Sequence, residues 1–333
     1  MSISQFMEIC LLHPKYGYYT NSSPFGQKGD FVTAPEVSQM FGELIGLFLA
    51  QAWSDQKNLE EAVLVELGPG RGTLTADIMR VTKSIKNFPK KIYLLEVSEK
   101  LKLLQKSNLE EYRVEWIKNL NQIPPGPIIL VANEFFDSLP INQYLKGADG
   151  WHERLVGIKN GELAFGISEQ KLNIQSTEYF THAVKGDIVE VRPSVEPIIT
   201  EISNKISQWG GISLIIDYGC WDLKGNTFQA IKSHKYINPL EKPGEADLTA
   251  HVDFSSLARS VLNCSISKLT DQGVLLERLG ISERANILSR SLKADDLENH
   301  IAAHRRLTHP KEMGTLFKVM AILPKLSLMP LGL

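Results

Sequence analysis

Short apolar runs and amphipathic segments alternate along most of the chain. The continuous apolar runs are residues 62–67, 91–96, 113–117, 127–132, 212–217 and 316–323. Residues 73–83 and 100–107, which lie between the first of these runs, have helical periodicity instead. Continuous apolar strands that alternate with helices are typical of a parallel sheet covered on both faces. The pattern therefore predicts an α/β fold with a Rossmann-like sheet.

Two regions depart from this alternation. The first 60 residues have helical periodicity around an aromatic loop, and residues 151–167 predict an antiparallel hairpin that turns at Asn160-Gly161. A further strand and helix are predicted before residue 210. We expect an N-terminal helical or lid segment, a core in two pieces and an inserted α+β subdomain on the substrate side. Their bounds are residues 1–60, residues 61–139 and 211–333, and residues 140–210.

Composition and charge narrow the class of protein. The chain has 333 residues, of which 43% are apolar and 22% charged, so it can bury a large core. The net charge of −2 gives no sign of a nucleic-acid or anionic membrane partner. No apolar run approaches the roughly 20 residues of a membrane span. Three dispersed cysteines and the histidine spacings predict no disulfide framework and no metal site. The first residues have no basic stretch followed by an apolar core, so we expect no signal peptide there.

A glycine-rich loop follows the first apolar run. It reads Glu66-Leu67-Gly68-Pro69-Gly70-Arg71-Gly72 and leads into a predicted helix. The dinucleotide pattern G-x-G-x-x-G would need glycine at position 73, which is Thr73. Glu66 precedes the glycines, where a pyrophosphate would be repelled and an ammonium group would be bound. The loop therefore favours S-adenosylmethionine (SAM) over a nicotinamide dinucleotide, which stays as a rival.

Polar residues also follow the second and fourth apolar runs. Glu96 ends the second run, where a carboxylate can accept hydrogen bonds from ribose hydroxyls. Asn133, Glu134 and Asp137 follow the fourth, at the sheet edge where ligands bind in open α/β sheets. The alternative interpretation makes these residues surface charges or a helix cap. We expect the cofactor-binding residues to be Glu66, Gly68, Pro69, Gly70, Gly72, Thr73, Glu96 and Asn133.

The N-terminal region holds a dense cluster of aromatic, glycine and acidic residues. It includes Tyr16, Tyr18, Asp30, Phe31 and Glu36. Such a loop suggests a lid or a substrate wall, although composition alone favours a small aromatic core under a turn.

Seven segments together resemble one family. They are residues 13–19, 29–43, 65–73, 132–140, 217–219, 247–254 and 313–319. These segments, in this order, look like the MidA family of SAM-dependent methyltransferases. The resemblance implies a seven-stranded methyltransferase sheet with a helical N-terminal extension and an inserted subdomain. It also implies protein arginine methylation, because the family's mitochondrial member symmetrically dimethylates an arginine of a respiratory complex I subunit.

An arginine acceptor sets requirements for the site. A guanidinium is a poor nucleophile, so carboxylates must orient it and accept a proton. We expect Glu134, Asp137 and Glu36 to be catalytic, and Tyr16, Tyr18, Asp30 and Phe31 to bind the substrate. A SAM-binding assembly chaperone without turnover and a small-molecule methyltransferase are the alternatives. The location would be cytoplasmic in a bacterium and the mitochondrial matrix in a eukaryote, and a homodimer stays open.

Overall fold

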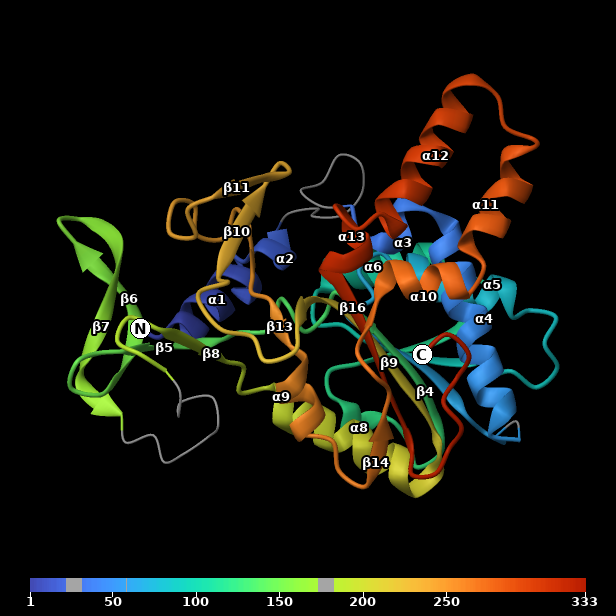
Figure 1. The fold of residues 1–333 in the computed structure, drawn as a ribbon, viewed down its shortest axis with the longest axis horizontal. Helices are drawn as coiled ribbons and strands as arrows, with labels where there is room; N and C mark the ends of the chain where they lie inside the picture. The colour runs from blue at the N-terminus through green and yellow to red at the C-terminus, as the bar shows by residue number, and fades with distance from the viewer. Residues whose placement is uncertain (22–31, 58, 173–182) are drawn as a thin grey trace.

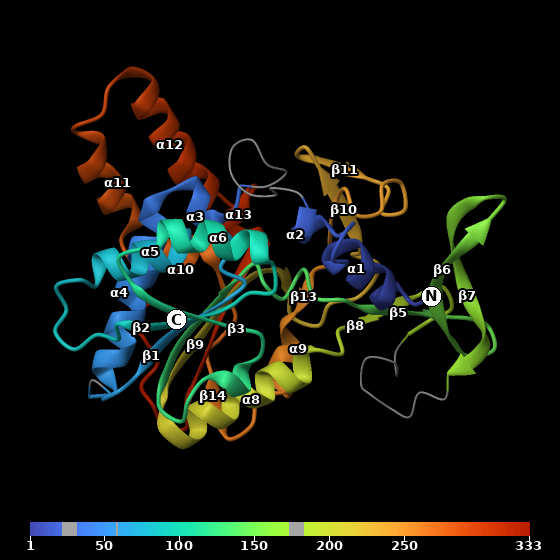
Figure 2. The same ribbon diagram turned by 180° about the vertical axis from the view of Figure 1, so that it is seen from behind.

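A seven-strand path forms the centre of the computed structural model, which describes residues 1–21, 32–57, 59–172 and 183–333. Its order is β14-β16-β9-β4-β1-β2-β3. Figure 1 labels β14, β16, β9 and β4 of this path, and Figure 2 labels β1, β2 and β3. The strands are β1 (Val63–Leu67), β2 (Lys91–Leu95), β3 (Arg113–Ile117), β4 (Ile128–Asn133), β9 (Gly211–Cys220), β14 (Cys264–Ile266) and β16 (Phe317–Pro324). Two short strands, β13 (Val252–Asp253) and β15 (Thr270–Asp271), pair with β9 and β16.

Strands β3, β2, β1, β4 and β9 are parallel, and β16 runs antiparallel between β9 and β14. This mixed sheet confirms the predicted α/β class. Leu67 at the end of β1 is level with Leu95 of β2 and Ala132 of β4. The direction in which strands are added reverses between β1 and β4, and ligands bind at such switch points.

Helices cover both faces of the central sheet (Figures 1 and 2). One face packs against α4 (Gln39–Asp55), α5 (Thr73–Val81), α10 (Gln272–Arg278), α11 (Ile281–Ser289), α12 (Ala294–Thr308) and α13 (Met313–Leu316). The other face packs against η1 (Leu120–Gln122), α8 (Val195–Trp209) and α9 (Phe254–Arg259). Helix α6 (Glu99–Asn108) follows β2.

A separate accessory part lies beside the central sheet. It contains a four-stranded sheet of order β7-β6-β5-β8 and a three-stranded sheet of order β11-β10-β12. Helix α1 (Ile3–Leu12) packs against both small sheets in a third apolar cluster (Figure 2). The strands are β5 (Asn142–Lys146), β6 (Trp151–Lys159), β7 (Glu162–Leu172), β8 (Ile188–Val191), β10 (Gln229–Lys232), β11 (Lys235–Ile237) and β12 (Asp247–Thr249). The short helices α2 (Tyr18–Asn21) and α3 (Ala34–Val37) follow α1.

The structure refines the expected division of the chain. The Asn160-Gly161 turn is present, and both residues have positive φ angles as a two-residue hairpin turn requires. Helix α8, expected in the inserted subdomain, packs its apolar face on the central sheet instead. Strands β10–β12, expected in the core, lie in the accessory part. No helix among the described residues is long and apolar enough to cross a membrane.

Candidate active site

Two cavities meet at the carboxyl ends of β1 and β4. The acidic cavity has a volume of about 460 Å³ and is lined by five carboxylates from four segments: Glu36, Glu66, Glu134 with Asp137, and Asp247. The apolar cavity, of about 530 Å³, is lined by leucine, proline and other apolar residues together with Glu96 and several further polar residues. Both cavities share four wall residues: Tyr19, Gly68, Gly70 and Glu134.

The glycine loop forms the floor between the cavities. Gly68, Gly70 and Gly72 have φ angles of 63°, 53° and 81°, in the left-handed region that glycine adopts freely. A Cβ atom on Gly68 would lie 2.9 Å from Cδ2 of Phe135, so the loop also needs glycine for space. The Glu66 carboxylate is buried behind the loop and accepts a hydrogen bond from the Thr75 hydroxyl. Its burial raises the pKa of Glu66 to about 7.

Glu96 lies where the sequence predicted it, at the end of β2 on the wall of the apolar cavity. Its carboxylate accepts hydrogen bonds from the Ser98 amide (2.7 Å) and from Nε2 of Gln105 (3.0 Å). Nε2 of Gln105 also donates to the Gly70 carbonyl at 2.8 Å. Gln105 therefore ties the glycine loop to Glu96. Gln105 could not be predicted from the sequence, because it is one of many polar residues on an amphipathic helix.

Glu134 stands at the junction of the two cavities. Its φ angle is 53°, uncommon for a residue with a side chain. Oε1 accepts hydrogen bonds from the Ala34 amide and from Nδ2 of Asn133, both at 3.1 Å. Burial and the nearby Asp137 raise the pKa of Glu134 to about 7. Oδ1 of Asn133 is buried and has no hydrogen-bond partner among the described residues.

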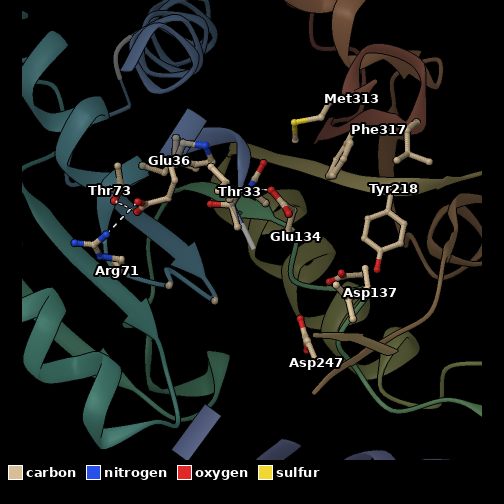
Figure 3. Close-up of a pocket in the computed structure, with 18 of the residues that line it drawn as sticks. Thr33, Glu36, Arg71, Thr73, Glu134, Asp137, Tyr218, Asp247, Met313 and Phe317 are labelled. Carbon is tan, nitrogen blue, oxygen red and sulfur yellow. Dashed lines mark hydrogen bonds and ion pairs between the residues drawn. The ribbon is translucent and has the colours of Figure 1, made fainter. Parts of the chain in front are cut away.

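Asp137 also lines the acidic cavity and lies near Tyr218 (Figure 3). Asp217 accepts hydrogen bonds from the amides of Phe136 (2.9 Å) and Asp137 (3.2 Å) and so holds this turn. Burial raises the pKa of Asp137 to about 6, while the Tyr218 hydroxyl and the charge of Arg192 oppose the rise. Oδ1 of Asp137 is buried and unpaired among the residues that the structure describes.

Arg192 is a buried cation that the sequence analysis missed. Its guanidinium donates hydrogen bonds to the carbonyls of Leu139 (3.1 Å) and Ala250 (2.9 Å). It therefore joins the end of β8 to the turn after β4 and to the segment after β12. Its positive charge faces Asp137 and Asp217. Nothing in the local sequence distinguishes this arginine from a surface residue.

Glu36 lines the acidic cavity, but its carboxylate faces the glycine loop. Oε1 accepts a hydrogen bond from the Thr73 hydroxyl (2.6 Å), and Oε2 pairs with Nη1 of Arg71 (3.2 Å), as Figure 3 shows. Both partners are within reach of Glu36 because α3 packs beside the start of α5. The residue predicted as catalytic thus contacts the loop predicted to bind the cofactor.

Two of the four predicted substrate residues of the N-terminal region lie away from the described cavities. Tyr16 is 63% exposed and stacks on His13, and Tyr18 is fully buried in the accessory apolar cluster. Neither lines a described cavity, because the turn into α2 points Tyr19 there instead. Asp30 and Phe31 lie outside the described residues.

The described residues fit S-adenosylmethionine. The unpaired Oδ1 of Asn133 and the buried Glu66 suit the ammonium group of an amino acid. Glu96 suits ribose hydroxyls, and the apolar cavity suits a purine. The acid at position 66 leaves no place for a pyrophosphate. The class of SAM-dependent methyltransferases is defined by three features found here. They are a seven-strand path in which one strand, β16, is antiparallel, a glycine loop after β1, and this site.

Comparison with known proteins gives the family. Residues 44–270 match the profile of a family described as "Putative S-adenosyl-L-methionine-dependent methyltransferase". The human mitochondrial protein arginine methyltransferase NDUFAF7 is 34% identical over 97% of this chain and 80% of its own length, and the Drosophila melanogaster homologue is 32% identical over 97% and 81%. The chain therefore belongs to this family of SAM-dependent methyltransferases, and the resemblance to the MidA family is confirmed.

A solved structure supports the cofactor directly. A Burkholderia thailandensis protein bound to S-adenosyl-homocysteine superimposes with a TM-score of 0.86 and is 25% identical. The match covers 100% of this chain and 89% of that chain. The predicted cofactor, SAM, is confirmed, and the nicotinamide rival is abandoned.

Proposed function

We propose that the protein transfers methyl groups from SAM to an arginine side chain of a protein. The observation that carries this proposal is the unpaired, buried Oδ1 of Asp137, which lies in an acidic cavity beside Glu134. An unpaired buried acceptor is costly unless a ligand supplies a donor. A guanidinium supplies five donors and a positive charge. The names of the relatives, protein arginine methyltransferases, agree with this acceptor.

The cofactor would occupy the apolar cavity and the floor between the two cavities. Glu96 would hold the ribose, Glu66 and Asn133 the ammonium group, and the backbone of Gly68 and Gly70 would approach closely. When bound, SAM supplies an electrophilic methyl group. Glu36 then acts by holding Arg71 and Thr73, and with them the start of α5, rather than by contacting the acceptor.

Two carboxylates would orient the acceptor. Asp137 and Glu134 can each accept N–H groups of one guanidinium, which fixes the plane of the acceptor. As a nitrogen–carbon bond forms and the sulfur–carbon bond breaks, the attacking nitrogen loses a proton. Glu134, with a pKa of about 7, can accept that proton at neutral pH. Tyr218 and Phe317 form an aromatic wall of the same cavity, with ring centroids 5.6 Å apart, over which a cation can lie.

The family resemblance extends the proposal to the acceptor protein. We place the acceptor arginine in a subunit of respiratory complex I or its bacterial equivalent. The reaction would then occur in the mitochondrial matrix of a eukaryote or in the cytoplasm of a bacterium.

The substitution Glu134→Gln tests the proposed roles. Glutamine keeps an oxygen that can accept from the Ala34 amide but cannot take up the proton. Transfer of tritiated methyl groups from SAM to protein arginine in a lysate should fall about 100-fold or more. Binding of S-adenosyl-homocysteine, measured by calorimetry, should change by less than about threefold.

Other outcomes would contradict this assignment. Unchanged transfer by the variant would remove Glu134 from the chemistry. Label that the wild-type protein places on small molecules and not on arginine would exclude a protein acceptor. Cofactor binding without any transfer would favour the chaperone interpretation.

A further inference from the structure

Tyr19 lies at the seam between the two cavities, since its side chain lines both. Two of its polar groups bind opposite sides of that seam. Its carbonyl oxygen accepts a hydrogen bond from the Ser98 hydroxyl at 2.7 Å. Its own hydroxyl donates to Oδ1 of Asp247 at 2.8 Å. One residue of α2 therefore connects the loop after β2 with strand β12.

Each end of this connection touches a group that belongs to one half of the site. The Ser98 amide donates to Glu96, the carboxylate assigned to the ribose, at 2.7 Å. Asp247 is 7% exposed and lines the acidic cavity. Asp137 lines the same cavity, and Figure 3 labels both residues there. The path Glu96–Ser98–Tyr19–Asp247 thus runs from the cofactor side to the acceptor side.

The electrostatics of the seam favour a fixed donor at this point. Burial, and then the charges of Asp247 and Asp137, hold the pKa of the Tyr19 hydroxyl well above its usual range. The hydroxyl therefore stays protonated and can donate to a carboxylate. A hydrogen bond to a charged acceptor contributes about twice as much as one between neutral groups. Tyr19 thus restrains the orientation of the Asp247 carboxylate.

We infer that Tyr19 is a positioning residue that couples cofactor binding to the acceptor side of the site through Asp247. A cofactor that engages Glu96 would order the Ser98 turn and with it the Tyr19 carbonyl. The Tyr19 hydroxyl would then hold Asp247 in place for a cationic acceptor. The inference rests on the proposed division of the two cavities into a cofactor half and an acceptor half.

Hydrogen–deuterium exchange tests the coupling without an acceptor. S-adenosyl-homocysteine is added to the wild-type protein and to Tyr19→Phe, which removes only the hydroxyl. In the wild type, the ligand should slow exchange of the amides of residues 246–251 about fivefold. This factor is at the low end of the range that typical coupling between two sites produces. In Tyr19→Phe this protection should be lost, while protection of the glycine loop, residues 66–72, stays.

A matched control removes a tyrosine hydroxyl elsewhere. Tyr112→Phe, at a residue that lines neither cavity, should behave as the wild type. Asp247→Ala removes the acceptor of the same hydrogen bond and serves if Tyr19→Phe fails to fold. Asp247→Ala should also lose the ligand-dependent protection of residues 248–251.

Two results would overturn the inference. The first is that the ligand does not protect residues 246–251 in the wild-type protein. The second is that the ligand protects these residues equally in Tyr19→Phe and in the wild type. Absence of arginine transfer would refute the proposed function but leave this measurement valid, because only the cofactor product is added.

Discussion

Glu134 carries two energetic costs in the folded protein. Its backbone is held at a φ angle of 53°, where a residue with a side chain is strained by roughly 1–3 kcal/mol. Its carboxyl group is also buried near Asp137. The hydrogen bonds from its amide to Ile216 and from the Ala34 amide to its side chain hold this conformation. Strain and burial at one residue are expected where a site is preorganised for a ligand.

Burial of the Glu134 carboxyl group should make the stability of the folded protein depend on pH. The pKa of Glu134 rises from 4.5 to about 7 on folding, so between these values the folded state keeps a proton that the unfolded state loses. Wild-type protein without ligand therefore loses stability as the pH rises through this window. Glu134→Gln has no charge to bury and should be more stable than the wild type by about 3 kcal/mol at pH 8.

A measurement at low pH is the control for this comparison of the wild type with Glu134→Gln. At pH 4.5 protonated glutamate resembles glutamine, so urea unfolding should give nearly equal stabilities for the two proteins. A difference that is the same at both pH values would show that burial of the charge is not its cause.

Sequence reasoning predicted that carboxylates at or near strand ends would lie close together. Glu66, Glu96 and Glu134 were predictable because parallel strands bring their carboxyl ends to one edge. Arg192 and Gln105 were not, since their partners are fixed only by tertiary packing: Arg192 contacts carbonyls more than 50 residues away in both directions. Which of Tyr16, Tyr18 and Tyr19 lines the cavities depends on where α2 begins, and composition does not specify that position.

Two glycines set the distance between helices α4 and α5. A Cβ atom on Gly42 would lie 2.5 Å from Cβ of Asp77, and one on Gly46 would lie 2.7 Å from Cγ1 of Val81. These contacts are too short for any side chain. Close packing here places the start of α5, and with it Thr73, beside α3. The helix pair therefore supports the glycine loop from behind.

The substitution Gly46→Ala should destabilise the protein. Alanine gains about 1 kcal/mol in helix propensity, but overpacking costs up to about 3 kcal/mol, and the Cα of Ile78 leaves little room to shift. We expect a net loss of about 1–2 kcal/mol in urea unfolding. Gly166→Ala is the control, because no atom of the described residues lies within 4 Å of its added Cβ. Equal effects of the two changes would contradict the packing argument.

The elements themselves were largely predictable, but their partners were less so. The third strand has the predicted bounds, Arg113–Ile117, and the β6–β7 hairpin forms because Asn160-Gly161 dictates its turn. The small sheet of β10–β12 was not foreseen. Its strands are three or four residues long, too short for a periodic signal, and their packing partner is α1, more than 200 residues away in sequence.

At the scale of the whole molecule, the site is a meeting point of separate parts. The central sheet supplies Glu66 and Glu134, the accessory part supplies Asp247, and the C-terminal helices supply Arg306 and Met313. Occupation of the cavities therefore stabilises contacts between parts that are distant in sequence.

Ligand binding should accordingly stabilise the entire fold. S-adenosyl-homocysteine at 100 times its dissociation constant adds about 2.7 kcal/mol, which corresponds to about 5 °C in melting temperature. Gly70→Val should abolish this shift, because a β-branched residue cannot adopt the φ angle of 53° without displacing the loop. A normal shift in this variant, measured by differential scanning fluorimetry, would contradict the placement of the cofactor.

The shared wall of the two cavities has a consequence for inhibitor design. Tyr19, Gly68, Gly70 and Glu134 border both spaces, so the two cavities adjoin along these residues. A single compound that joins an adenosyl group to a guanidine could fill both at once. Such a compound loses its translational freedom only once, so its affinity can exceed that of either fragment by orders of magnitude. Its selectivity would come from the geometry of the junction rather than from the cofactor pocket.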